Sequence, residues 1–107
     1  MRNPEIDIIL RKIKDHLNHL YKDRLQAIIL YGSQAREDSH KDSDIDILVV
    51  LSGPTNPYKE IDRTSDFIAQ ICLEYNVLIS RHFVSSEKFH TGSTPFLQNV
   101  GREGIAL

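Results

Sequence analysis

The stretch "YGSQAREDSHKDSDID", residues 31–46, links two apolar runs and decides how the chain folds. The first run covers residues 25–31 and the second covers residues 45–51. Continuous apolarity over this length is typical of strands that are covered on both faces. Because a glycine-serine step follows the first run and two aspartates enter the second, we expect two strands whose polar groups gather at one end.

Helices are predicted on both sides of this unit. Asn3-Pro4-Glu5 is a helix start, and the apolar residues that follow recur at three- and four-residue steps to about residue 22. Asn56-Pro57 repeats the same start signal, and Asn76 is a typical helix stop. We therefore expect helices over about 4–22 and 57–75.

The remaining segments complete a small α/β (α+β) fold. Residues 77–84 predict a third strand, and the residues from 85 predict a turn or short helix. Thr94-Pro95 predicts the start of a final short helix, which Gly101 or Gly104 ends. This order predicts a small mixed β-sheet flanked by helices. The length of 107 residues suits a single domain, 1–107, with one core.

Composition excludes several classes of protein. The formal net charge is −2 with acidic and basic residues well mixed, so no basic stripe for a long nucleic acid is visible. No apolar run is long enough to span a bilayer, and the sequence opens without a cationic secretion leader. The one cysteine, Cys72, cannot form an internal disulfide. We expect a cytoplasmic protein.

Asp44 and Asp46 are candidate metal ligands. Side chains at i and i+2 of a strand point to the same face, so the two carboxylates should lie side by side. Two neighbouring carboxylates repel each other, and a divalent cation reverses that repulsion. Ligands made only of oxygen suit Mg²⁺ or Mn²⁺, which complete their coordination with water and substrate phosphates.

Gly32-Ser33 is a candidate phosphate-binding turn. Glycine lets the backbone approach a phosphate closely, and the next helical turn can present N–H groups beside the Ser33 hydroxyl. Ordinary turn chemistry explains an isolated Gly-Ser equally well. The sequence contains neither G-x-x-x-x-G-K-[ST] nor G-x-G-x-x-G, which disfavours a P-loop or Rossmann site.

The combination is more specific than either part. A Gly-Ser turn, ten intervening residues and Asp44-Ile45-Asp46 on a strand resemble the minimal nucleotidyltransferase (MNT) family of the polymerase-β-type superfamily. The segments "GSQAR", "SDIDILVVL", "VSSEKF" and "FLQNVGREGIAL" extend the resemblance over most of the chain. It implies a polymerase-β-like palm fold.

The resemblance also implies a reaction. Gly32 and Ser33 would hold the phosphates of a nucleoside triphosphate, Arg36 would add positive charge, and Asp44 and Asp46 would bind the catalytic metals. The reaction would transfer a nucleoside monophosphate, AMP from ATP, to a hydroxyl group. Similar proteins pair with a helical HEPN-domain protein in prokaryotes, some as antitoxins that adenylylate the toxin. A homodimer is the alternative way to close the site.

One departure from the family keeps other functions open. Full members carry a third carboxylate on the next strand, but residues 76–84 contain no acid. Ser80 and His82 share a face of that strand, and aligning "VSSEKF" assigns His82 to the missing position. His82 is either a substitute proton acceptor or metal ligand, or an ordinary strand residue. The chain is accordingly an enzyme, a nucleotide-binding protein with weak or no catalysis, or a protein that neutralises a partner.

Overall fold

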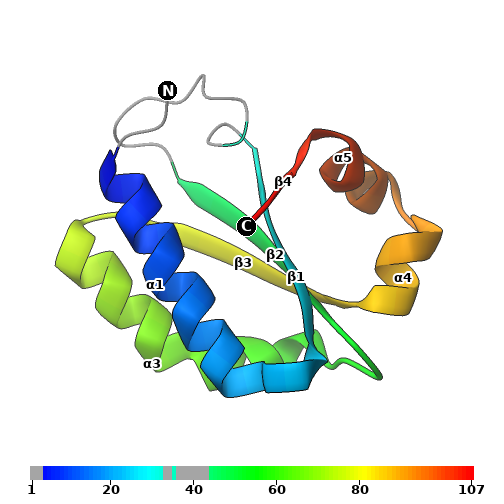
Figure 1. Cartoon of the computed structure of the whole chain (residues 1–107), viewed down its shortest axis with the longest axis horizontal. Helices are drawn as coiled ribbons and strands as arrows, with labels where there is room; N and C mark the ends of the chain where they lie inside the picture. The colour runs from blue at the N-terminus through cyan, green and yellow to red at the C-terminus, as the bar shows by residue number, and fades with distance from the viewer. Residues whose placement is uncertain (1–3, 33–34, 36–43) are drawn as a thin grey trace.

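The computed structural model of the chain describes residues 4–32, 35 and 44–107, and it has the predicted mixed α/β architecture (Figure 1). Its elements, in chain order, are α1 (Pro4–Tyr21), the 3₁₀ helix η1 (Lys22–Arg24), β1 (Leu25–Tyr31), β2 (Ile45–Leu51), α3 (Pro57–Tyr75), β3 (Ile79–Ser85), α4 (Ser86–Thr91), α5 (Pro95–Glu103) and β4 (Ile105–Ala106).

The described strands form one four-stranded mixed sheet in the order β3-β2-β1-β4. β1 is antiparallel to β2 and to β4, whereas β2 and β3 are parallel. A parallel pair needs a long crossover connection, and α3 supplies it. As a result, the C-terminal end of β1 lies at the same end of the sheet as the N-terminal ends of β2 and β3.

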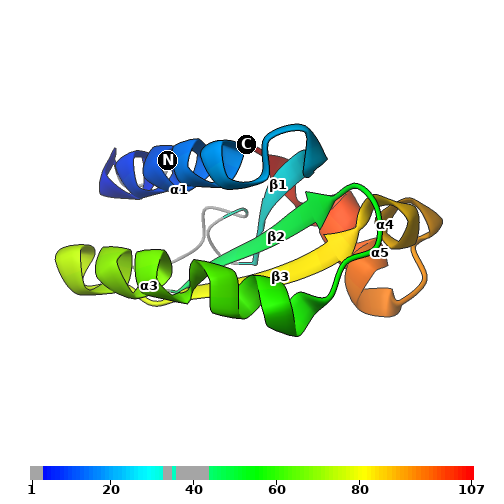
Figure 2. The same cartoon turned by 90° about the horizontal axis from the view of Figure 1, so that it is seen from below.

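Helices cover both faces of the sheet. α1 and α3 pack on one face and α4 and α5 on the other; in Figure 1 and in Figure 2 the first pair lies toward the left and the second toward the right. Alternate residues of β2 serve the two sides: Ile45, Ile47 and Val49 belong to the core under α1 and α3, and Leu48 and Val50 pack with residues of α5. Both apolar runs are therefore strands covered on two faces, as predicted.

Local signals in the sequence set the helix boundaries. The Asn56 side chain accepts hydrogen bonds from the backbone N–H groups of Tyr58 and Lys59, and Asn76 ends α3 in the left-handed conformation with φ 53°. The predicted helix 57–75 is confirmed. None of the described helices combines the length and apolar character needed to cross a membrane.

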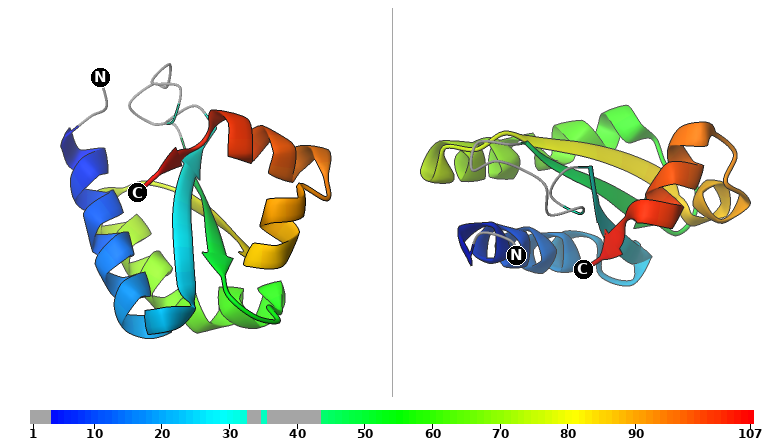
Figure 3. Two further views of the ribbon diagram at one scale, coloured as in Figure 1. Left: turned by 45° about the vertical axis from the view of Figure 1, so that its right-hand side comes forward. Right: turned by 90° about the horizontal axis from the view of Figure 1, so that it is seen from above.

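The C-terminal segment adds a strand that the sequence did not predict. Gly104, one of the two predicted stops, follows the end of α5, and the residues after it pair with β1 as an edge strand (Figure 3). A Cβ atom at Gly104 would lie 2.3 Å from Ile29 Cγ2, so only glycine fits this close approach. The apolar tail is thus part of the sheet. β3 also begins at Ile79 rather than at residue 77.

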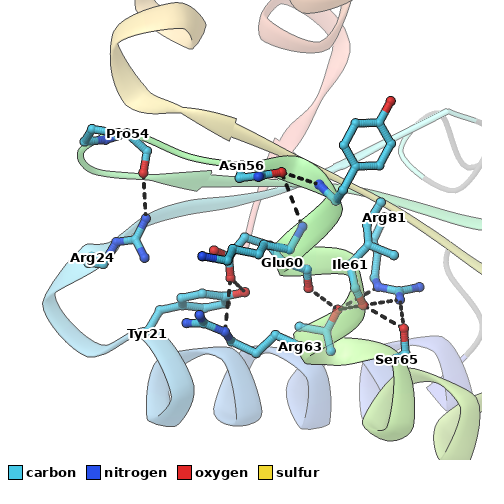
Figure 4. A network of polar contacts seen from close by, with 12 residues as sticks. Tyr21, Arg24, Pro54, Asn56, Glu60, Ile61, Arg63, Ser65 and Arg81 are labelled. Atoms are coloured by element: carbon cyan, nitrogen blue, oxygen red, sulfur yellow. Dashed lines mark hydrogen bonds and ion pairs between the residues drawn. The ribbon is translucent and has the colours of Figure 1, made fainter.

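Polar contacts join α3 to α1 and to β3 (Figure 4). The Tyr21 hydroxyl donates to Glu60 Oε1 over 2.8 Å, and Arg63 Nε lies 3.5 Å from the same oxygen. Burial, followed by the hydrogen bond to Glu60, raises the pKa of Tyr21. The guanidinium of Arg81 donates to three oxygen atoms of α3: Thr64 Oγ1, Ser65 Oγ and the carbonyl of Ile61. These contacts fix α3 against the sheet.

Candidate active site

The end of β1 and the start of β2 bring the predicted turn and the second aspartate together. Tyr31 pairs with Asp46 across the two strands, and Gly32 follows with φ 75°. A Cβ atom at Gly32 would lie 2.6 Å from Asp46 Oδ2, so a side chain there would collide with the carboxylate. Glycine is therefore needed at position 32 for two reasons: the backbone is left-handed, and the Asp46 carboxylate occupies the space of a side chain.

The charge on Asp46 is held at an energetic cost. Asp46 is half-buried, and burial is the main reason that its pKa is raised above the ordinary value. The charge of Asp44, which is exposed directly before β2, raises it further, while His82 lowers it. Among the described residues, no hydrogen bond or ion pair offsets the charge of this carboxylate.

This donor set fits a divalent metal. It offers two carboxylates whose repulsion a cation would relieve, and the absence of a side chain at Gly32 gives Asp46 Oδ2 room. In the described part of the chain, no three His, Cys, Asp or Glu side chains gather into a metal site. Two carboxylates alone suit Mg²⁺ or Mn²⁺, whose remaining ligands are water and phosphate oxygens.

β3 contributes polar but no acidic side chains to the same face. Ser80 lies directly opposite Asp46 in the parallel register, and His82 lies opposite Leu48. The charge of His82 lowers the pKa of Asp46. The position directly beside Asp46 thus belongs to Ser80, and His82 approaches from farther along the strand.

Two aromatic residues at this site escaped the sequence analysis. Tyr31 Oη lies 2.9 Å from His82 Nδ1, and the Phe96 ring packs edge-on against Tyr31 with ring centroids 5.4 Å apart. Burial, followed by the charge of Asp46, raises the pKa of Tyr31 to about 12. The spacing of Tyr31 from Ile29 could have placed it on this face, but no local signal marks Phe96, because its position depends on how α5 docks.

The other predicted site residues, Ser33 and Arg36, lie outside the described residues. Gly32, Asp44, Asp46 and His82 are described, and the structure gathers them at one edge of the sheet. Their roles remain predictions.

A cavity of about 550 Å³ lies at the other end of β2, beside Gly53 and α4. Its hydroxyl groups bond to nearby backbone groups: Ser85 Oγ accepts from the backbone N–H of Lys88, Thr91 Oγ1 donates to the Lys88 carbonyl, and Thr55 Oγ1 donates to the Gly53 carbonyl. None of the predicted site residues that the structure describes lines this cavity.

Comparison with known proteins identifies the family of the chain. The profile of the nucleotidyltransferase domain matches residues 10–95. Two proteins of Methanocaldococcus jannaschii, each named "putative protein adenylyltransferase", are similar over most of their length. The first is 31% identical, and the alignment covers 96% of this chain and 99% of the relative. The second is 37% identical, and the alignment covers 91% of this chain and 95% of the relative.

Solved structures agree on the fold. A crystal structure described as a putative nucleotidyltransferase from Sulfolobus solfataricus superposes with a TM-score of 0.65 at 19% identity, covering 92% of this chain and 75% of the other. A toxin-antitoxin structure with AMP-PNP gives a TM-score of 0.60 at 22% identity, covering 92% and 70%. A toxin-antitoxin complex named MntA-HpeT gives 0.58 at 20% identity, with the same coverage. The match to the minimal nucleotidyltransferases is confirmed, and the chain belongs to the nucleotidyltransferase domain family.

Proposed function

We propose that this nucleotidyltransferase transfers AMP from ATP to a hydroxyl group in a reaction that depends on Mg²⁺ or Mn²⁺. The observation that carries the proposal is the position of Asp46: a Cβ atom at Gly32 would lie 2.6 Å from its Oδ2, and burial, followed by the charge of Asp44, raises its pKa. The names of the adenylyltransferase relatives support AMP as the transferred group.

Each residue then has a defined task. Asp44 and Asp46 would hold the metal, which would supply charge stabilisation to an in-line displacement at the α-phosphate. Gly32 and Ser33 hold the triphosphate, and Arg36 adds positive charge to it. His82 accepts the proton of the attacking hydroxyl in place of the third carboxylate.

The acceptor hydroxyl belongs, in this proposal, to a partner protein. The domain, residues 1–107, offers one sheet face and little wall for an acceptor, so a partner must complete the site. Toxin-antitoxin complexes among the similar structures support a toxin as partner, and the family resemblance favours a helical HEPN-domain protein in the cytoplasm of a prokaryote. In such a pair this chain is the antitoxin.

A second function rests on one observation: β3 presents Ser80 and His82 where the family carries an acid. Without that third negative charge, a second metal ion would be held weakly. The chain would then bind the nucleotide, or neutralise its partner, with slow or no transfer.

Transfer of label from α-labelled ATP to the partner, with and without Mg²⁺, tests the proposal. Asp46→Asn should lower transfer by at least about 100-fold because it removes charge that stabilises the transition state through the metal. Asp66→Asn, which changes an exposed carboxylate of α3, is the matched control and should leave transfer unchanged.

The alternatives have distinct results. Nucleotide binding measured by calorimetry, without label transfer by the wild type, would support the binding function and contradict the enzyme. Protection against the partner by Asp44→Asn and Asp46→Asn variants that fold normally would show that neutralisation needs no chemistry.

A further inference from the structure

Three rings from three elements meet at the aspartate end of the sheet. Tyr31 is the last residue of β1, His82 lies on β3, and Phe96 lies in the first turn of α5. Tyr31 Oη is 2.9 Å from His82 Nδ1, and the Phe96 centroid lies 5.4 Å from both the Tyr31 and the His82 ring centroids. Although His82 is exposed, its ring is thus held by a hydrogen bond to Tyr31 and by ring contacts with Tyr31 and Phe96.

The hydrogen bond decides which imidazole nitrogen is available for chemistry. A neutral histidine carries one proton, and the partner of one nitrogen selects the state of the other. If Nδ1–H donates to Tyr31 Oη, Nε2 keeps its lone pair and can accept a proton. If Tyr31 donates to Nδ1 instead, Nε2 carries the hydrogen and cannot.

The role proposed for His82 requires the first arrangement. Tyr31 Oη occupies Nδ1, so Nε2 is the nitrogen that is left to accept a proton. Nε2 can accept that proton only while Nδ1 carries the hydrogen and donates it to the phenol oxygen. No acid on β3 is needed to orient the ring.

We propose that Tyr31 is a positioning residue that holds His82 as the Nδ1–H tautomer, so that Nε2 takes the proton of the acceptor hydroxyl. This inference rests on the proposed function. In the step, the acceptor oxygen bonds to the α-phosphorus, the bond from that phosphorus to pyrophosphate breaks, and the proton moves to Nε2 and then to solvent. The pair replaces the missing carboxylate.

Nitrogen NMR of ¹⁵N-histidine-labelled protein tests the tautomer without any catalysis. With the His82 signals assigned by a His82→Gln variant, the wild type should show a protonated Nδ1 and an unprotonated Nε2 when the ring is neutral. Tyr31→Phe keeps the packing against Phe96 but removes Oη, and should move His82 toward the Nε2–H form that free histidine favours. A protonated Nε2 in the wild type, or an unchanged tautomer in Tyr31→Phe, would overturn the proposal.

Kinetics separate positioning from a purely structural role. Tyr31→Phe should lower kcat by about 10- to 100-fold, the usual loss when a partner that orients a histidine is removed, with the KM for ATP unchanged. In a His82→Asp background the same change should cost nothing, because a carboxylate has no tautomer to select. Tyr58→Phe, at a tyrosine that is 81% exposed, is the matched control.

The two failures can be told apart. Equal losses from Tyr31→Phe in the His82 and His82→Asp backgrounds would reject positioning while leaving the enzyme intact. Absence of transfer by the wild type would reject the proposed function, and the NMR result would then decide the tautomer by itself.

Discussion

Two carboxylates of this protein, Glu60 and Asp46, lie toward opposite ends of β2. They differ in whether other groups of the chain compensate their negative charge. Glu60 is only 4% exposed, accepts a hydrogen bond from Tyr21 and faces Arg63, so its charge is compensated. Asp46 is half-buried beside a second carboxylate, Asp44, and its pKa is raised.

From this difference we infer a structural role for Glu60 and a functional role for Asp46. A buried carboxylate that holds a fold together needs partners within the chain, because an unpaired buried charge is costly. A carboxylate that binds a metal needs no partner within the chain, because the bound cation compensates its negative charge. Stability should therefore depend on Glu60, and activity on Asp46.

Removing Glu60 should have the largest effect on stability. Glu60→Ala leaves the Tyr21 hydroxyl without its acceptor and Arg63 without its partner, so we expect a loss of about 3 kcal/mol in the free energy of unfolding. Urea denaturation measures it. Glu74→Ala is the control, because its ion pair with Lys12 is exposed and should contribute little to stability. Equal losses in the two variants would remove the contrast.

Gly32 and Gly53 allow a sharper test of the aspartate end. Both have positive φ, 75° and 79°, so an alanine should cost each about 1–2 kcal/mol of backbone strain. Only at Gly32 would the new Cβ meet Asp46 Oδ2, whereas nothing lies within 4 Å at Gly53. Gly32→Ala should therefore lose nucleotidyl transfer and Gly53→Ala should keep it. An equal loss of nucleotidyl transfer in the two variants would argue against a role for the close approach of Gly32 and Asp46.

The smallest effect is on the pH dependence of stability without metal. Below its unfolded pKa, Asp46 is protonated in both states and contributes no penalty. The pKa of Asp46 is higher in the folded than in the unfolded state, so raising the pH through the range between these two values lowers the free energy of unfolding. Above that range the loss in the free energy of unfolding stays constant. From about pH 4 to about pH 7, the wild type should lose less than about 1 kcal/mol relative to Asp46→Asn. Urea midpoints in EDTA measure the difference, and a gain by the wild type would contradict the sign.

Mg²⁺ added to the same samples should stabilise the wild type and leave Asp46→Asn unaffected, because a ligand that binds only the folded state shifts the unfolding equilibrium.

Much of the fold could be predicted because its signals are local. The strands 25–31 and 45–51 and the helix 57–75 have the bounds that apolar runs, Asn56-Pro57 and Asn76 indicated. Capping and periodicity act within a few residues, so neighbours in sequence are enough to recognise them. The pairing of the C-terminal tail with β1 could not be predicted in this way, since it joins segments more than seventy residues apart.

The same division holds for the candidate site. The sequence by itself determined that a glycine turn precedes two aspartates on one face of a strand, and that no acid follows on the next strand. Only the tertiary structure decided that Ser80 lies beside Asp46, that Glu60 is buried, and that Tyr31, His82 and Phe96 meet. Register and helix docking are set by the packing of the whole core, which minimises exposed apolar surface over distant segments and leaves no trace in any short stretch of sequence.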